Sequence, residues 1–130
     1  MHVERKTSPD LATPPGYAHV AVAHGHRLVM TAGGVPLDAQ GNLVGEGDVA
    51  AQTRQVIANL IEQLHLGGAT PDDVLKTTVY VVATENPALV TAWNEVQASP
   101  LAPAASTLLG VACLGYTGQL VEIEAVAALK

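Results

Sequence analysis

Residues 74–82, Val-Leu-Lys-Thr-Thr-Val-Tyr-Val-Val, decide the fold, because they form the densest run of β-branched residues in the chain. Such a run favours a buried strand. The clearest helix precedes it and extends from Asp48, a suitable N-cap, to the helix-ending pair Gly67-Gly68. Apolar residues recur there at three- and four-residue spacing, which places them on one helical face: Val49, Val56, Ile57, Leu60, Ile61 and Leu64.

The flanking segments predict more strands and one more helix. Asn86 caps a second helix that has Pro87 in its first turn and ends before Pro100. Residues 1–16 contain three prolines and form an irregular lead-in, and residues 35–45 form an extended excursion with polar turns. Strands are predicted at four places: Tyr17–Ala23, Arg27–Ala32, near Ser106–Ala112 and near Leu120–Ala127. The chain is therefore expected to be one α+β domain over residues 1–130, a single sheet with two helices on one face.

Composition excludes several classes of protein. The 130 residues are 48% hydrophobic, which argues against disorder, and no apolar run approaches the roughly 18 residues of a membrane span. The net charge is −6 and no basic stripe exists, so nucleic-acid binding is not expected. The single Cys113 cannot form an internal disulfide, which favours a cytoplasmic protein. No His or cation stands near it in the sequence to activate the thiol, so we expect it to be buried and unreactive. Two helices cannot cover both faces of an apolar sheet, so other subunits are the expected cover.

The residues that could carry chemistry are few. His24 and His26 flank a glycine at a turn and lack further ligands at metal spacing, so no metal and no cofactor are expected. Gly33-Gly34 marks either a close backbone approach or a pocket lined by backbone. Glu122 and Glu124 alternate with aliphatic residues and share one strand face. They lie either on a solvated face or in place for proton transfer.

Several motifs in the same order resemble one known family. They are Pro15-Gly16-Tyr17, Leu28-Val-Met-Thr-Ala-Gly-Gly-Val-Pro-Leu37, Gln52-Thr-Arg-Gln55, Val74-Leu-Lys-Thr-Thr-Val-Tyr-Val81 and Leu120-Val-Glu-Ile-Glu-Ala-Val-Ala127. Together they are similar to the Rid family of reactive-intermediate deaminases, also called the YjgF/YER057c/UK114 or endoribonuclease L-PSP family. The resemblance implies a chorismate-mutase-like (ferredoxin-like) fold assembled as a homotrimer with a small-molecule cleft between subunits.

The resemblance also implies roles for particular residues. Glu122 would activate water, Tyr17 would be the aromatic residue of the cleft, and Gly33 and Gly34 would form its wall. The family's deaminases bind a substrate carboxylate through an Arg, whose forked guanidinium suits that task. Here Ser106 occupies that position, or Ala105 one register earlier, and no Arg follows residue 54.

The missing Arg changes the expected substrate. Loss of a charged donor removes roughly 1.5–3 kcal/mol of carboxylate binding. We therefore expect a deaminase-like enzyme that hydrolyses an imine or enamine other than the usual carboxylate-bearing substrates. The alternative is a non-catalytic trimer that binds a metabolite or a partner in the same cleft.

Overall fold

The fold is that of a computed structural model, which describes residues 2–25 and 27–130. Its elements in chain order are β1 (Val3–Lys6), β2 (Val20–Ala23), β3 (Arg27–Met30), α1 (Val49–Leu66), the short 3-10 helix η1 (Pro71–Asp73), β4 (Val74–Val82), α2 (Asn86–Gln97), β5 (Ala105–Val111) and β6 (Val121–Leu129).

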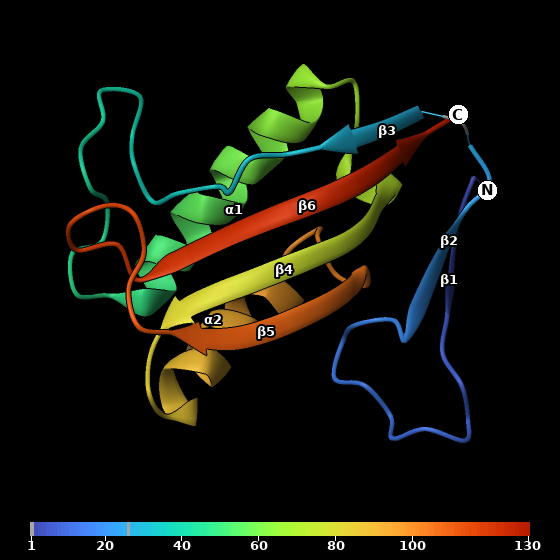
Figure 1. The fold of residues 1–130 in the computed structure, drawn as a ribbon, viewed down its shortest axis with the longest axis horizontal. Coiled ribbons are helices and arrows are strands. Elements are labelled where there is room, and N and C mark those ends of the chain that lie inside the picture. Colours follow the sequence, from blue (N-terminus) through green and yellow to red (C-terminus); the bar gives the residue numbers. More distant parts are fainter. Residues whose placement is uncertain (1, 26) are drawn as a thin grey trace.

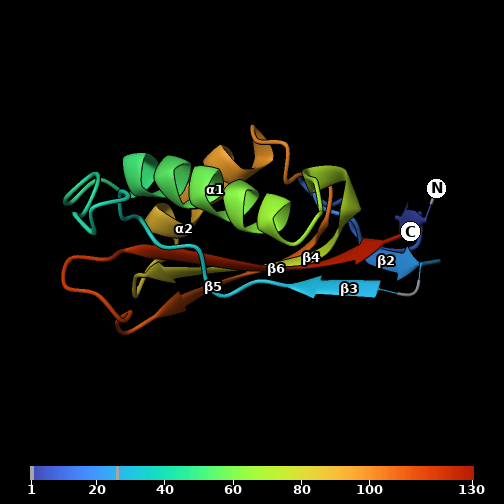
Figure 2. The ribbon, with the colours of Figure 1, turned by 90° about the horizontal axis from the view of Figure 1, so that it is seen from above.

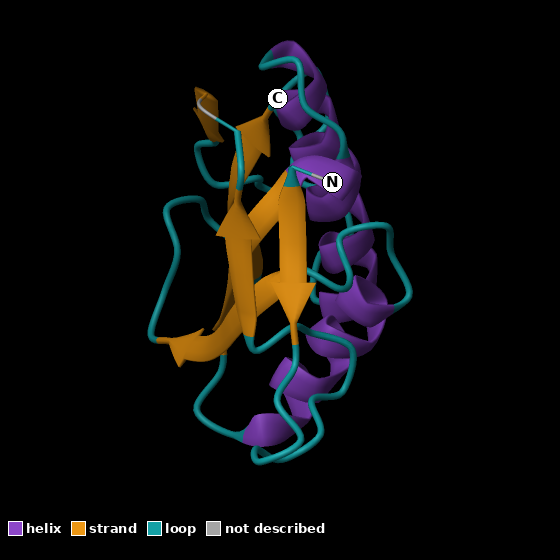
Figure 3. Cartoon of the chain, turned by 90° about the vertical axis from the view of Figure 1, so that its right-hand side faces the viewer, coloured by secondary structure: helices purple, strands orange, loops and turns teal. Residues whose placement is uncertain are grey.

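Four strands form the main sheet in the order β3-β6-β4-β5. β4 and β5 are parallel and are joined by α2, whereas β6 is antiparallel to both β3 and β4. Both helices pack on one face of this sheet, and the other face has no helix on it (Figure 1 and Figure 2). Figure 3 shows the same two layers from the end of the molecule. The predicted α+β arrangement with two helices on one face is confirmed.

The core lies between the helices and the sheet. Alternate residues of β6 are buried, as expected for a strand with one covered face. Side chains from α1, α2, β4 and β6 meet there: Val56, Leu60, Leu64, Ala92, Val96, Val79, Val81, Val121, Ile123 and Ala125. Asp48 caps α1 as predicted, with its Oδ1 accepting a hydrogen bond of 3.0 Å from the amide of Ala51. The cap of α2 is Glu85, one residue before the predicted Asn86.

Two predictions are wrong in part: that all strands form a single sheet, and that residues 1–16 are irregular throughout. Residues 3–6 of the lead-in form β1, which pairs antiparallel with β2 in a separate two-stranded ladder. The strand predicted at 17–23 begins only at Val20, and the excursion at 35–45 forms a turn closed by a bridge between Leu37 and Leu43.

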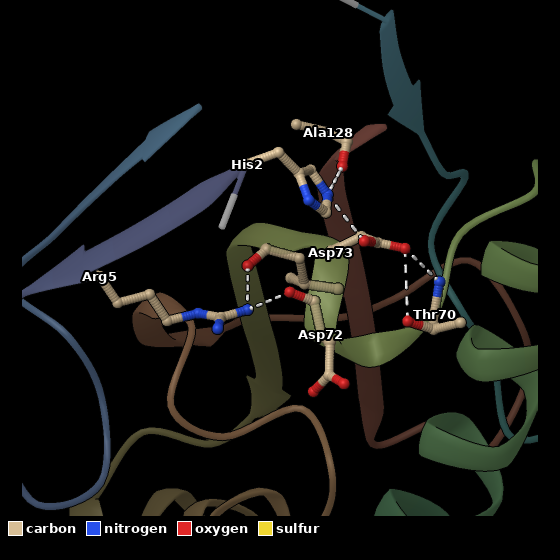
Figure 4. Close-up of polar contacts among 7 residues, drawn as sticks. His2, Arg5, Thr70, Asp72, Asp73 and Ala128 are labelled. Atoms are coloured by element: carbon tan, nitrogen blue, oxygen red, sulfur yellow. Dashed lines mark hydrogen bonds and ion pairs between the residues drawn. The ribbon is translucent and has the colours of Figure 1, made fainter. Parts of the chain in front are cut away.

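Polar contacts hold β1 across the end of the main sheet (Figure 4). Nε2 of His2 lies 2.8 Å from both a carboxylate oxygen of Asp73 and the carbonyl oxygen of Ala128. Nη2 of Arg5 donates to the carbonyl of Asp72 at 2.9 Å and to that of the first residue of β4 at 2.8 Å. These contacts give hydrogen-bond partners to carbonyls at the end of the sheet and connect β1 to it.

The sheet face opposite the helices, here called the open face, is less apolar than the sequence suggests. Its centre carries Lys76, Thr78, Tyr80, Glu122 and Glu124, which follow from the alternation of β4 and β6. Its β3 end carries Leu28 and Met30, whose exposed fractions are 60% and 74%. No helix of the described residues is long and apolar enough to span a bilayer.

Candidate functional site

Glu122 lies on the open face near the start of β6, opposite Tyr80 of β4. One carboxylate oxygen, Oε1, accepts a hydrogen bond of 3.0 Å from the side-chain amide of Gln119. The other, Oε2, lies against the backbone of Gly33, where an added Cβ would stand only 2.2 Å away. Glu122, Gln119 and Gly33 are called the Glu122 cluster below. The carboxylate is thus oriented by a neutral donor and keeps acceptor capacity for a water molecule or a substrate proton.

The two glycines of the bend have different roles. Gly33 is required sterically, because any side chain there would collide with the carboxylate of Glu122. Gly34 forms a bridge to β6, donating to the carbonyl of Ile123 at 2.7 Å and accepting from its amide at 3.2 Å. The structure therefore favours the first of the two interpretations of Gly33-Gly34, a close approach to a neighbouring strand. The amide of Gly34 is already paired within the chain.

Gln119 is a site residue that the sequence analysis missed. It is only 3% exposed, and its Nε2 also donates to the carbonyl of Val121 at 3.0 Å. Its Oε1 accepts from the amide of Tyr116 at 3.1 Å. All three contacts hold the amide so that it faces Glu122. The only sequence signal is its position three residues before that glutamate.

A second buried glutamine, Gln52 of α1, fixes the loop that carries Gln119. Its Nε2 donates to the carbonyls of Gly45 and Gly118 at 3.1 and 3.0 Å, and its Oε1 accepts from the amide of Leu120 at 2.7 Å. Gln52 is fully buried, so these backbone groups would otherwise lose a partner. The loop before β6 and the loop before α1 meet at this end of the sheet (Figure 1).

Glu124, the other carboxylate on this face, is engaged differently. The phenol of Tyr80 donates a hydrogen bond to its Oε1. This bond, together with the negative charges of Glu124 and Glu122, raises the pKa of Tyr80 above its ordinary value. The predicted sharing of one face by both glutamates is confirmed by the strand register. Glu122, whose partner is an amide, is the better candidate for proton transfer.

A pocket of about 260 Å³ lies beside the edge strand β5 and α2. It is lined by Pro15, Tyr17, Trp93, Ser106 and Leu108 and is called the aromatic pocket below. Nε1 of Trp93 donates to the carbonyl of Pro15 at 2.8 Å. The rings of Tyr17 and Trp93 are in an edge-to-face arrangement, with centroids 6.1 Å apart. Trp93 therefore packs against the hydrophobic core and also forms a wall of this pocket.

The loop before β2 positions Tyr17. Gly16 has φ of +92°, which permits the turn between Pro15 and Tyr17. His19 fastens the loop from the other side, with Nδ1 accepting from the amide of Ser8 at 3.0 Å and Nε2 lying 3.0 Å from the carbonyl of Ala12. Nδ1 is thus an acceptor and Nε2 carries the proton. His19 supports the pocket wall and does not line the pocket.

Ser106 and Ala105 lie on opposite faces of β5. The hydroxyl of Ser106 accepts a hydrogen bond of 2.7 Å from Thr77, a buried residue on the helix side of β4. Ser106 lines the aromatic pocket, and Ala105, next along the strand, does not. Because Glu122 occupies the open face, the aromatic pocket and the Glu122 cluster lie on opposite faces of one sheet. Within one chain, Tyr17 lies near Ser106 and Glu122 lies near Gly33, but the two pairs are separated by the sheet.

Cys113 corrects one prediction, because its side chain is exposed instead of buried. It lies in the loop between β5 and β6, outside any strand whose alternation could turn it inward. Among the described residues, no group of three or more His, Cys, Asp or Glu side chains could hold a metal ion.

A family model described as Endoribonuclease L-PSP matches residues 7–129. The chain belongs to the Rid/YjgF family. A RutC family protein of Synechocystis is 36% identical over 118 residues, which cover 89% of this chain and 88% of that one. The crystal structure of YyfB, a Rid family protein of unknown function from Yersinia pestis, superposes with a TM-score of 0.87 at 37% identity, covering 99% of this chain and all of YyfB.

Other members match over shorter segments. The 2-iminobutanoate/2-iminopropanoate deaminase of Salmonella typhimurium is 37% identical over 68 residues, 52% of each chain. The match with a RutC family protein of Pyrococcus abyssi is 37% identical over 54 residues, and the chain spans 42% of that protein's length. The Salmonella typhimurium protein is the one of these relatives whose name states a reaction, the deamination of 2-imino acids.

Proposed function

We propose that this Rid family protein hydrolyses small imines or enamines that lack the usual carboxylate, in a cleft between subunits. The observation that carries the proposal is the oriented carboxylate of Glu122, held by Gln119 against Gly33. The deaminase of Salmonella typhimurium supports the reaction class. No cofactor is needed, because water is the only co-reactant.

The proposed chemistry uses Glu122 twice. As a general base it takes a proton from water while the water oxygen bonds to the imine carbon and the imine nitrogen gains a proton from solvent. As a general acid it returns its proton to the amino group while the hydroxyl proton of the intermediate passes to solvent, and the carbon–nitrogen bond breaks to release ammonia and the carbonyl product. The net reaction consumes one water for each imine. Gly33, without a side chain, makes room for the carboxylate itself, because Oε2 lies only 2.2 Å from where a Cβ at this position would stand.

The cleft requires a second copy of the chain, and we propose a homotrimer. In one chain the aromatic pocket and Glu122 lie on opposite faces of the sheet, so the site is incomplete without a neighbour. Leu28 and Met30 give the open face an exposed apolar end that a neighbour would cover. In this arrangement Tyr17 and Ser106 of one subunit face Glu122, Gly33 and Gly34 of the next. Light scattering should report about three times 13.4 kDa, and a stable monomer would contradict the proposal.

A non-catalytic role as a binding protein is the second candidate. The observation that favours it is the absence of charge from the lining of the aromatic pocket. In the expected alignment, Ser106, or Ala105 one register earlier, stands where a family deaminase has its Arg. A net charge of −6 makes nucleic acid an unsuitable ligand, so the binding role would be for a small metabolite or another partner that is not a nucleic acid. The single cysteine is consistent with action in the cytoplasm.

The test separates the two candidates through matched carboxylate variants. Glu122→Gln keeps the shape and the contact with Gln119 but removes the base, so ammonia release from 2-butanimine should fall to background. Glu124→Gln is the control on the same face and should keep activity. Light scattering must show the same oligomer for all three proteins. Equal activity in Glu122→Gln and wild type would overturn the catalytic assignment, and inactivity of the wild type would favour the binding role.

A further inference from the structure

We propose that the aromatic pocket binds a neutral aromatic group, which makes aryl-substituted, uncharged imines the substrate class of this protein. The inference deepens the proposed function and rests on it, because a bound imine is a substrate only if the protein hydrolyses it. The binding specificity itself follows from the pocket alone. Four of the five lining residues present carbon surface: Pro15, Tyr17, Trp93 and Leu108.

The polar groups of the pocket are already engaged. The indole N–H of Trp93 donates to the carbonyl of Pro15, so it is not free to bind a ligand oxygen. The hydroxyl oxygen of Ser106 accepts from Thr77 and retains a single O–H to donate. One hydroxyl hydrogen suits a neutral acceptor, such as an imine nitrogen or a carbonyl oxygen. It cannot replace the two parallel donors that a guanidinium offers to a carboxylate.

Charged ligands of either sign are disfavoured. None of the lining residues is a cation, so a carboxylate would lose its hydration without an ionic partner. None is an anion either, and Tyr17 and Trp93 meet edge to face instead of offering two converging ring faces to an ammonium group. A neutral ring contacts both aromatic side chains favourably. It carries no charge, so its binding has no free-energy cost from removing water around a charged group.

The size of the pocket agrees with one ring. A cavity of roughly 150 Å³ lined by apolar residues accommodates benzene. The volume here is about 260 Å³, which leaves room for a ring and a short substituent that reaches out of the pocket. A two-carbon side chain, such as that of a small imino acid, would leave most of this volume without contacts.

Trp93 provides a direct reporter, because it is the only tryptophan of the chain and forms the pocket wall. Its fluorescence should change in a saturable way when the native oligomer is titrated with benzyl alcohol. Benzoate and benzylamine, which have the same ring with opposite charges, should bind at least tenfold more weakly. Propan-1-ol tests for the ring itself and should also bind at least tenfold more weakly than benzyl alcohol.

Matched variants locate the binding. Tyr17→Ala removes one wall and keeps the reporter, so the affinity for benzyl alcohol should fall about tenfold. Val90→Ala, at an exposed position of the same helix as Trp93, should leave the affinity unchanged. Calorimetry repeats both titrations without relying on fluorescence.

The outcomes separate this inference from the proposed function, since binding is measured without turnover. Binding of benzyl alcohol that is tighter than that of benzoate, benzylamine and propan-1-ol supports the inference even if ammonia release is never detected. Tight binding of benzoate, preference for benzylamine, or no binding of benzyl alcohol would overturn it. In the last case, ammonia release from 2-butanimine would leave the proposed hydrolysis intact.

Discussion

The two halves of the site are built on opposite principles. The Glu122 cluster is polar and oriented: a buried amide holds the carboxylate, and a second buried glutamine holds the loop that carries the amide. The aromatic pocket is apolar, and its wall is positioned by packing and by a loop fastened at His19. One half is suited to moving a proton and the other to recognising shape. The two halves lie on opposite faces of the sheet, so in the proposed site two copies together would apply both to one ligand.

The largest effect that sharpens this contrast is expected for Gln119→Leu. A hydrogen bond to a charged group contributes roughly 1.5–3 kcal/mol, so kcat for ammonia release should fall about 10- to 100-fold. KM should change little, because the aromatic pocket is untouched. Gln40→Leu, in an exposed turn, is the control. A loss of thermal stability in Gln119→Leu while kcat stays at the wild-type value would reduce Gln119 to a structural role.

The next effect concerns the missing Arg. Ser106→Arg places a guanidinium in the aromatic pocket, and ammonia release from 2-iminopropanoate should rise by one to two decades, as about 1.5–3 kcal/mol implies. Ala105→Arg is the matched control, since that residue does not line the pocket. A gain with Ala105→Arg instead would show that the substrate lies over the open face. Rapid turnover of 2-iminopropanoate by the wild type would contradict the account of both halves.

The smallest effect is a titration within the polar half. The hydrogen bond from Tyr80 to Glu124 raises the pKa of the phenol, so the folded state favours the protonated form. The contribution of this hydrogen bond to the free energy of unfolding is fully present below the ordinary tyrosine pKa. It is lost as the pH rises through the raised pKa of Tyr80. Ultraviolet titration of the three tyrosines should show one late phase that Tyr80→Phe removes. Three tyrosines titrating together in the wild type would contradict the contact.

Local patterns predicted much of the fold because periodicity and turn residues express it directly. The range 74–82 coincides with β4, and Asp48 caps α1 as expected. The β1–β2 ladder could not be predicted, because its position depends on contacts of His2 and Arg5 with residues 126 and 69 positions away, respectively.

The site was predictable only where alternation or a motif marked it. Period-two alternation placed Glu122 and Glu124 on one face, and that assignment is confirmed. Gln52 and Gln119 act through buried contacts with distant or irregular backbone, for which no spacing rule exists. Trp93 fits a helical core pattern equally well as a pocket wall, so periodicity alone could not separate the two roles.

The central claim, that one site needs the Glu122 cluster of one copy and the aromatic pocket of another, is tested most directly by mixing subunits. Glu122→Gln and the double variant Tyr17→Ala/Trp93→Ala should each release little ammonia from phenylmethanimine when expressed alone. Co-expressed in equal amounts, they should recover about a quarter of wild-type activity, because random assembly of a trimer gives one site in four both intact halves. Activity no greater than the sum of the two separate variants would contradict the shared site.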